Sequence, residues 1–529
     1  MLGTATSTGR VRAEGKFLFR GERKLHLRGV TYGTFAPDHD GYLCPAPAVV
    51  DRDFAAMARS GINVVRVYTQ PPRWLLDLAA DHGLLVLVGL WWEQNVAFLD
   101  DRARRRAVEA KFRAGVRACA GHPAVLAYAV GNEIPAGIVR WHGRRPVERF
   151  LERLVAAARD EDDALVTYVN FPSTEYLEVP SADFVSFNVY LEDPDRLAAY
   201  LARLHSLAGD RPLVLAELGL DSRRHGREVQ AQSMRAQLQS AFAAGCAGTF
   251  AFAWTDEWHC GGFDIEDWDF GLTDRARRPK PALAAVERAY AQLPLPEQRR
   301  WPRMSVAVCS YNGARTLADC LDGALALDYP DYEVIVVSDG STDATAEIAR
   351  SRGVRVIETP NRGLSSARNT ALAAASGEIV AYLDDDARPD PHWLRHLAAA
   401  FDDPACAAAG GPNIAPPGAG WVAACVDRSP GGPAHVMLSD TEAEHLPGCN
   451  LAVRRRDLEL IGGFDSRFRI AGDDVDVCWR LQEHGRRLRF CPGAVVLHHR
   501  RTTVRAYARQ QRGYGAAEAL LERKWPERY

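Results

Sequence analysis

The segment IVAYLDDDARP, residues 379–389, joins an apolar β-strand to three consecutive aspartates, Asp384, Asp385 and Asp386. Three adjacent carboxylates repel one another, so a fold tolerates them poorly unless a cation binds there. Carboxylate oxygens at the end of a strand suit Mg²⁺ or Mn²⁺, and such an ion commonly bridges to a phosphate. The alternative is a solvated acidic turn, and the neighbouring sequence decides between the two.

The sequence around this segment alternates between strands and helices, as in a doubly wound α/β sheet. The expected strands are 305–309, 333–338, 354–358 and 378–383, and the expected helices are 316–327, 344–351 and 365–375. In such sheets, ligands bind at the carboxyl ends of the strands. The triplet is therefore predicted to lie at a ligand-binding edge.

Polar motifs follow these strands in order. Ser310–Asn312 follows the first strand, Ser338–Asp343 the second, and Asn361–Asn369 runs into the third helix ahead of the triplet. Downstream, Leu446–Asn450 precedes a second acidic cluster within Ala471–Asp476. The chain has no glycine-rich phosphate loop of the G-x-G-x-x-G or Walker type, which argues against dinucleotide and NTPase sites.

This series of motifs, over residues 304–500, resembles family 2 of the inverting glycosyltransferases, which have a nucleotide-diphosphosugar-binding domain of the GT-A type. The resemblance implies that Asp339 contacts the nucleotide base and that Arg368 lies near the diphosphate. It further implies that Asp384 binds the ribose or the metal, and that Asp386 ligates the Mn²⁺ or Mg²⁺ that neutralises the leaving diphosphate.

The resemblance also indicates the catalytic base. Where the family usually has Glu-Asp, this chain has Asp473-Asp474; we expect Asp474 to deprotonate the acceptor and Asp473 to bind substrate, with the choice between them open. Charge clustering can raise the pKa of a base, whereas an acid-rich helix N-terminus is the alternative. His498 is expected to complete the metal shell; the alternative is a basic surface patch with Arg500 and Arg501.

The first 292 residues predict a different architecture. Eight apolar runs alternate with mostly helical patterns, at residues 27–32, 62–68, 84–90, 125–130, 165–170, 184–190, 213–217 and 248–254. Eight strands that alternate with helices over fewer than 300 residues are typical of a (β/α)₈ barrel, whose catalytic groups lie at the carboxyl ends of the strands. The proline-rich stretch 293–303 is the expected linker to a second domain, 304–529.

Two glutamates fall at the ends of predicted barrel strands, Glu133 after the fourth and Glu217 in the seventh. In a retaining glycosidase, one carboxyl stays protonated for the leaving oxygen and the other attacks the sugar. Aromatic residues near strand ends are expected to stack on sugar faces. These are Tyr32, Tyr68, Trp91, Trp92, Tyr190, Trp254 and Trp258.

These residues resemble the (β/α)₈ clan of retaining β-glycosidases, and residues 269–281 resemble the end of the family 2 glycoside hydrolase barrel. The resemblance implies that Glu133 is the acid/base and Glu217 the nucleophile. Asn132 would bind the sugar 2-hydroxyl and Tyr190 would orient the nucleophile. The residues expected to bind substrate in the barrel are Arg66, Trp92, Asn132, Tyr190 and Trp254.

The composition is that of a soluble globular enzyme, with 47% hydrophobic and 25% charged residues and a formal net charge of −3. This balance gives no reason to expect a nucleic-acid or anionic-membrane partner. Residues 1–10 have no apolar leader, the apolar stretch 84–92 is too short to span a bilayer, and the 11 cysteines form no CxxC pairs. We therefore expect a cytoplasmic protein without a membrane span.

The expected function is bifunctional. The second domain would transfer a sugar from a nucleotide-diphosphate donor, expected to be a UDP-sugar, to a glycan or glycoconjugate acceptor with inversion. The barrel would trim or transglycosylate a β-linked glycan, in polysaccharide or glycoconjugate assembly. Two alternatives remain open: a barrel that only binds glycan, and a non-catalytic scaffold in a polysaccharide export complex.

Overall fold

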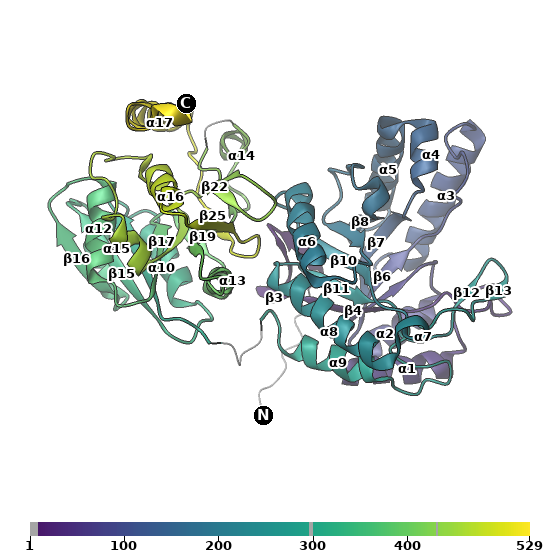
Figure 1. Cartoon of the computed structure of the whole chain (residues 1–529). Helices are drawn as coiled ribbons and strands as arrows, with labels where there is room; N and C mark the ends of the chain where they lie inside the picture. The colour runs from purple at the N-terminus through teal and green to yellow at the C-terminus, as the bar shows by residue number, and fades with distance from the viewer. Residues whose placement is uncertain (1–8, 296–299, 430–431) are drawn as a thin grey trace. The chain divides into compact units, whose positions relative to one another are not determined.

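The computed structural model describes residues 9–295, 300–429 and 432–529 (Figure 1). The chain divides into two compact units, residues 1–296 and 297–529. Residues 296–299 of the predicted linker, and residues 1–8 of the segment examined for a leader, lie outside the described residues. None of the helices in the described part of the chain combines the length and apolarity needed to cross a membrane.

Unit 1 is a closed barrel of parallel strands in the order β10-β11-β4-β5-β6-β7-β8-β9. Its strands are β4 (Leu27–Thr31), β5 (Val64–Val67), β6 (Leu85–Gly89), β7 (Val125–Asn132), β8 (Leu165–Asn170), β9 (Val185–Asn188), β10 (Leu213–Leu218) and β11 (Gly248–Ala251). All eight predicted runs overlap a barrel strand, so the predicted (β/α)₈ fold is confirmed.

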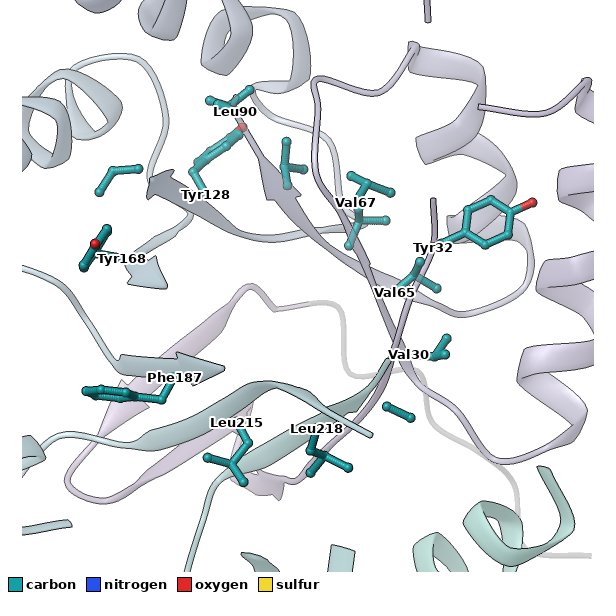
Figure 2. Packing of buried hydrophobic residues seen from close by; sticks show 14 of the residues in the cluster. Val30, Tyr32, Val65, Val67, Leu90, Tyr128, Tyr168, Phe187, Leu215 and Leu218 are labelled. Carbon is teal, nitrogen blue, oxygen red and sulfur yellow. The ribbon is translucent and has the colours of Figure 1, made fainter. Parts of the chain in front are cut away.

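The barrel strands are mainly apolar because both of their faces are buried, one in the barrel interior and one under the helices; their few polar residues include Arg66 and Glu217. Val30, Val65 and Val67, from the neighbouring strands β4 and β5, belong to one buried cluster with residues from the other strands (Figure 2). A strand buried on both faces therefore gives a mainly apolar run rather than an alternating one, which is why these strands could be recognised.

Helices surround the barrel (Figure 1). They are α1 (Pro47–Arg59), α2 (Arg73–Asp81), α3 (Arg102–Cys119), α4 (Ala136–His142), α5 (Arg144–Arg159), α6 (Pro194–Ala208), α7 (Ser222–His225), α8 (Arg227–Ala243) and α9 (Pro281–Ala291). The short gap between β8 and β9 holds only the 3₁₀ turn η1 (Pro172–Thr174). Short strands in two further sheets were not predicted, namely β1 (Val11–Glu14), β2 (Phe17–Arg20), β3 (Arg23–Leu25), β12 (His259–Cys260) and β13 (Phe263–Asp264).

A buried ion pair stabilises the barrel near its last strand. Lys280 Nζ lies 2.7 Å from Asp256 Oδ1, and the two side chains are only 1% and 3% exposed. We expect Lys280→Met to lower the free energy of unfolding by about 3–5 kcal/mol, because it leaves the Asp256 charge buried without a partner. The measurement is urea unfolding of the full chain.

The matched control is Lys111→Met, which breaks the exposed pair between Lys111 and Glu93 (3.5 Å; side chains 54% and 51% exposed). That variant should lose less than about 1 kcal/mol. Equal losses in the two variants would show that burial adds nothing to the Lys280–Asp256 pair.

Unit 2 is built on a seven-stranded sheet in the order β16-β15-β14-β17-β23-β19-β24. The strands are β14 (Met304–Ser310), β15 (Tyr332–Asp339), β16 (Arg355–Thr359), β17 (Ile379–Asp384), β19 (Cys406–Gly410), β23 (Asn450–Arg454) and β24 (Arg487–Phe490). β14 to β17 are parallel, whereas β23 runs antiparallel to β17 and β19. The sheet is thus mixed, with the predicted parallel part at one side.

Helices cover both faces of this sheet, as expected of a doubly wound fold. They are α10 (Leu317–Leu325), α11 (Thr345–Ser351), α12 (Leu364–Ala374), α13 (Trp393–Ala400), α14 (Trp421–Asp427), α15 (Arg455–Leu460), α16 (Asp473–Glu483) and α17 (Val504–Lys524), followed by the 3₁₀ turn η2 (Pro526–Arg528). In β14, Val306 and Val308 pack in the cluster with α10 and α13, and Ala307 packs in the cluster with α12 and α16. This alternation is the period-2 pattern of a strand.

Small strands extend the edge of unit 2 that carries the acidic triplet. They are β18 (Ala387–Pro389), β20 (Asn413–Ile414) and β25 (Val496–His498), in the order β18-β25-β20. β21 (Val436–Met437) and β22 (Ala443–His445) form a separate pair. Each of these strands has only two or three residues.

Candidate active sites

A cavity of about 480 Å³ lies at the carboxyl ends of the barrel strands, and both predicted glutamates line it. Glu133 directly follows β7, and Glu217 lies near the end of β10. The barrel topology therefore brings together two carboxyls that are far apart in the sequence. Aromatic side chains supply much of the remaining wall, namely Tyr68, Tyr190, Phe252, Trp258, Trp268 and Phe270.

Three donors hold the carboxylate of Glu217. Tyr190 donates from its hydroxyl to Oε2 (2.6 Å), and Tyr68 donates to Oε1 (2.9 Å). The guanidinium of Arg66, which is 1% exposed, donates to Oε1 from 2.9 Å. Charge-assisted hydrogen bonds of this kind fix the orientation of an anionic side chain, as a nucleophile requires.

The second glutamate has a different environment. Burial raises the pKa of Glu133, and the nearby charge of Glu217 raises it further. Asn188 Nδ2 donates to Glu133 Oε1 (2.8 Å). Glu133 also adopts a φ of 52°, a backbone conformation that non-glycine residues rarely take and that is concentrated at functional sites. Its environment thus favours the protonated form that a general acid needs.

Replacing Asn188 by alanine is expected to move the alkaline limb of the pH profile of kcat/KM to higher pH. That limb reports the acid of the free enzyme, and the Asn188 hydrogen bond favours the ionised form of Glu133, holding its pKa down. The profile is measured with aryl β-glycosides. Tyr190→Phe is the control, because Tyr190 contacts Glu217 rather than Glu133. If the alkaline limb of Asn188→Ala stays at the same pH or moves to lower pH, Glu133 is not the general acid.

Two predicted substrate-binding aromatics lie away from this cavity. Trp92 is 1% exposed and donates from Nε1 to the carbonyl of Val130 (2.9 Å), while its ring packs against Phe98. Trp254 is also 1% exposed. Neither side chain lines this cavity, whereas Trp92 lines a separate cavity with Trp91. The predicted stacking of these two residues on sugar stays a prediction, because a position near a strand end does not determine which way a side chain faces.

Several residues of this site were missed. Asn188, which donates to Glu133, lies two positions before Tyr190, a spacing that places both on one face of an extended chain and could have revealed it. Phe252 lines the cavity, two positions before Trp254. Trp268 and Phe270 lie in a long loop after the last barrel strand, where no periodic pattern indicates their direction.

In unit 2 the acidic triplet lies at the end of β17, beside the end of β14, where Asp384 is in register with Cys309. The pairing of β18 with β25 sets Ala387 opposite His498. As a result, His498 Nε2 lies 3.0 Å from Asp386 Oδ1. Two predicted metal ligands that are 112 positions apart in the sequence therefore meet.

The three carboxyls of the triplet have different environments. Burial raises the pKa of Asp384, and it raises the pKa of Asp385 to about 7 with help from the Asp386 charge. Burial would also raise the pKa of Asp386, but His498 and Arg501, whose Nη1 lies 3.0 Å from the carboxylate, hold that pKa well below its usual range. The inner member, Asp385, accepts a hydrogen bond from Ser310.

Arg368 connects the triplet to the second acidic cluster. Its guanidinium is buried and lies 2.8 Å from Asp473 Oδ2 and 3.4 Å from Asp384 Oδ1. Gly448 allows this approach, because a Cβ at that position would lie only 2.3 Å from Arg368 Nη2. The predicted diphosphate-binding arginine thus lies between the two groups of carboxylates.

The three aspartates of the second cluster differ in burial and in hydrogen bonding. Asp473 is 1% exposed, and burial raises its pKa to about 6. Asp476 is fully buried and accepts a hydrogen bond from Trp525 Nε1 (3.0 Å). Asp474 is half-buried, and its Oδ2 accepts from the amide of Gly448 (2.7 Å). Solvent access therefore favours Asp474 over Asp473 as the residue that meets an acceptor.

Asp339 lies at the end of β15 and is 4% exposed. Its carboxylate accepts hydrogen bonds from the amides of Arg362 (2.9 Å) and Gly363 (2.8 Å), at the loop before α12. Asp339 therefore fixes the loop that leads into α12, the helix that carries Arg368. The predicted contact with a nucleotide base stays a prediction.

The side chains at this edge fit a divalent cation. The ligand atoms of Asp384, Cys449 and His498 lie within 4.8 Å of one another, and Asp386 adjoins His498. Nδ1 of His498 lies 2.9 Å from Arg500 Nη1, and its Nε2 lies 3.0 Å from Asp386 Oδ1. A cation bound at Nε2 must displace any proton held there, and the role of His498 as a ligand stays a prediction.

A barrel with two carboxyls in an aromatic-lined cavity, joined to an α/β unit with acidic clusters at its strand ends, defines a two-domain protein of the carbohydrate-active class. The chain belongs to the glycosyl hydrolases family 2 through its TIM barrel domain, matched at residues 11–294, and to glycosyl transferase family 2 through its second unit, matched at residues 305–461.

Two curated relatives are glycosyltransferases. The pre-mycofactocin glycosyltransferase of Mycobacterium tuberculosis is 33% identical over 227 residues, 41% of this chain and 46% of the relative. Glycosyltransferase AglE of Haloferax volcanii is 31% identical over 206 residues, 37% of this chain and 67% of the relative. The chain thus spans about half the length of the first. Among solved structures, a GH2 β-galacturonidase from Eisenbergiella tayi bound to galacturonate matches 54% of each chain, with 20% identity and a TM-score of 0.47.

Proposed function

We propose that unit 2 transfers a sugar from a nucleotide-diphosphate donor, a UDP-sugar, to a hydroxyl of a glycan or glycoconjugate, with inversion at the anomeric carbon. One observation carries this proposal: Arg368 lies between the triplet at the end of β17 and the acidic start of α16. A donor diphosphate and an acceptor hydroxyl would thereby meet at one edge of the sheet, as a single displacement requires.

The reaction would use the chain's own groups as follows. Asp474 takes the proton of the acceptor hydroxyl while its Oδ2 is held by the amide of Gly448. Arg368 offsets the negative charge that develops on the diphosphate. A bound Mn²⁺ or Mg²⁺ would be held by Asp384 and Asp386, with His498 beside them, and would supply further positive charge to the leaving group.

We propose that the barrel is a retaining β-glycosidase or transglycosylase. Glu217, fixed by Arg66 and two tyrosines, attacks the anomeric carbon; Glu133 protonates the departing oxygen and then activates the incoming water or hydroxyl. Asn132 Oδ1 accepts from Arg66 Nη2 (2.7 Å). Its amide nitrogen is therefore the group that can donate to the sugar 2-hydroxyl.

The test of the transferase is a screen of nucleotide sugars for Mn²⁺-dependent release of the nucleoside diphosphate, repeated with Asp386→Ala. Turnover that depends on Asp386 supports the proposal and excludes a non-catalytic scaffold. For the barrel, Glu217→Gln is compared with the parent chain on aryl β-glycosides. Equal rates in the two chains would leave a barrel that binds glycan without cleaving it.

A further inference from the structure

The thiol of Cys449 lies within the group of side chains that fits a cation. Cys449 is 2% exposed, and its Sγ lies within 4.8 Å of ligand atoms of both Asp384 and His498. A second group of potential ligands, residues 38–40, differs because it is largely exposed and contains no sulfur. The cluster at β17 thus combines oxygen, nitrogen and sulfur donors inside the protein.

The backbone fixes the position of this thiol. β23 pairs antiparallel with β17, with Asn450 opposite Leu383, so Cys449 is the residue that faces the start of the triplet. The side chain of Asn450 anchors this end of β23: it accepts from Trp393 Nε1 (2.8 Å) and donates to the carbonyls of Pro412 (3.1 Å) and Ala494 (2.7 Å). The thiol is therefore held beside Asp384 by rigid neighbours rather than by the rotamer of a long side chain.

The electrostatic surroundings can accept a further negative ligand. Arg368 lies 3.4 Å from Asp384, Arg501 lies 3.0 Å from Asp386, and Arg500 donates to His498. Three guanidinium groups thus surround the cluster. Their charge offsets the repulsion that a thiolate would otherwise meet beside two carboxylates.

We propose that Cys449 is a ligand of the cation, which makes this centre a mixed oxygen–sulfur site that selects borderline ions over Mg²⁺. The proposal rests on the metal requirement of the proposed transferase and deepens it. Thiolates bind Zn²⁺ and Co²⁺ well, whereas Mg²⁺ prefers oxygen ligands alone. As the sulfur–metal bond forms, the S–H bond breaks and its proton passes to solvent; no electron is transferred.

Co²⁺ alone is the probe for the test, because a thiolate bound to Co²⁺ gives an intense near-ultraviolet charge-transfer band that oxygen and nitrogen ligands do not give. The full chain carries Cys260→Ser and Cys425→Ser to remove its two exposed thiols. In this background we expect a band that saturates with Co²⁺ and disappears in Cys449→Ala. Loss of a ligand should weaken Co²⁺ binding by at least about tenfold, since loss of an outer hydrogen-bond partner already costs about 10- to 100-fold.

Matched controls are the two other thiols close to the triplet. Cys309 is in register with Asp384, and Cys320 Sγ lies 3.5 Å from the carbonyl of Asp384. Cys309→Ala and Cys320→Ala should keep the band. Cys449→Ser preserves the side-chain volume and should lose the band as the alanine variant does. X-ray absorption of the Co²⁺-loaded parent should show one sulfur atom bound to the metal, and this measurement does not depend on any variant folding.

Binding of Co²⁺ without the band, a band that survives in Cys449→Ala, or one lost in Cys309→Ala or Cys320→Ala overturns the inference but leaves the metal requirement standing. No binding of Co²⁺, Mn²⁺ or Mg²⁺, with or without UDP, overturns both. Binding of UDP by each variant confirms that its site is folded.

Discussion

Replacing Glu217 by alanine is expected to reduce the hydrolysis of aryl β-glycosides by at least about 10⁴-fold, since loss of a nucleophile leaves only binding and electrostatic contributions. Arg66, Tyr68 and Tyr190 all direct hydrogen bonds to this carboxylate and would remain in place without it. The measurement is kcat/KM on substrates with activated leaving groups, with the folded state checked by circular dichroism.

Azide can distinguish the roles of the two glutamates. In Glu217→Ala, azide enters from the face of the missing carboxylate, so the product is an α-glycosyl azide. In Glu133→Ala, the intermediate on Glu217 still forms, and azide attacks it to give a β-glycosyl azide. The opposite pair of products would exchange the two assignments, and an unchanged rate in both variants would show that the cavity does not cleave glycosides.

In the transferase, Asp474→Asn is expected to lower kcat by about 10²- to 10⁴-fold, the usual contribution of a general base. Asparagine has nearly the same shape, and its side-chain oxygen can still accept from the Gly448 amide that holds Asp474 at 2.7 Å. Affinity for UDP should therefore stay the same while turnover is lost. Steady-state kinetics and calorimetric UDP binding measure these two effects separately.

Asp473→Asn is the matched control, because it removes a neighbouring charge that is buried against Arg368 at 2.8 Å. We expect that change to weaken UDP binding and lower stability, since Arg368 loses the anion that fixes it between the two clusters. If Asp473→Asn instead abolishes turnover with UDP binding intact, and Asp474→Asn does not, the base is Asp473.

The barrel could be predicted from the sequence because its strands are buried on both faces, so that each run is mainly apolar and long enough to recognise. Strand ends also located Glu133 and Glu217 on the rim. The direction of side chains around the rim could not be predicted in the same way. Trp92 and Trp254 pack into the interior, whereas Phe252 reaches the cavity, because local loop geometry sets these directions.

For the candidate site of unit 2, the motifs could be predicted from the sequence but the contacts between them could not. The acidic triplet and the start of α16 are continuous in sequence, but their connection through Arg368 is a tertiary contact over 105 positions. The meeting of Asp386 with His498 depends on β18 and β25, strands of three residues each. Elements this short leave no periodic pattern, so their pairing has to be seen in three dimensions.

The helix that carries Asp474 depends on a much later part of the chain. Asp476, on the same turn of α16, is held by Trp525 Nε1 at 3.0 Å and by Lys524 Nζ at 2.6 Å, 49 and 48 positions downstream. Trp525 and Leu521 also pack with Trp479 of α16. During synthesis the barrel can complete its core before these residues exist. We therefore expect a nascent chain to gain glycosidase competence first and transferase competence only once α17 has been made.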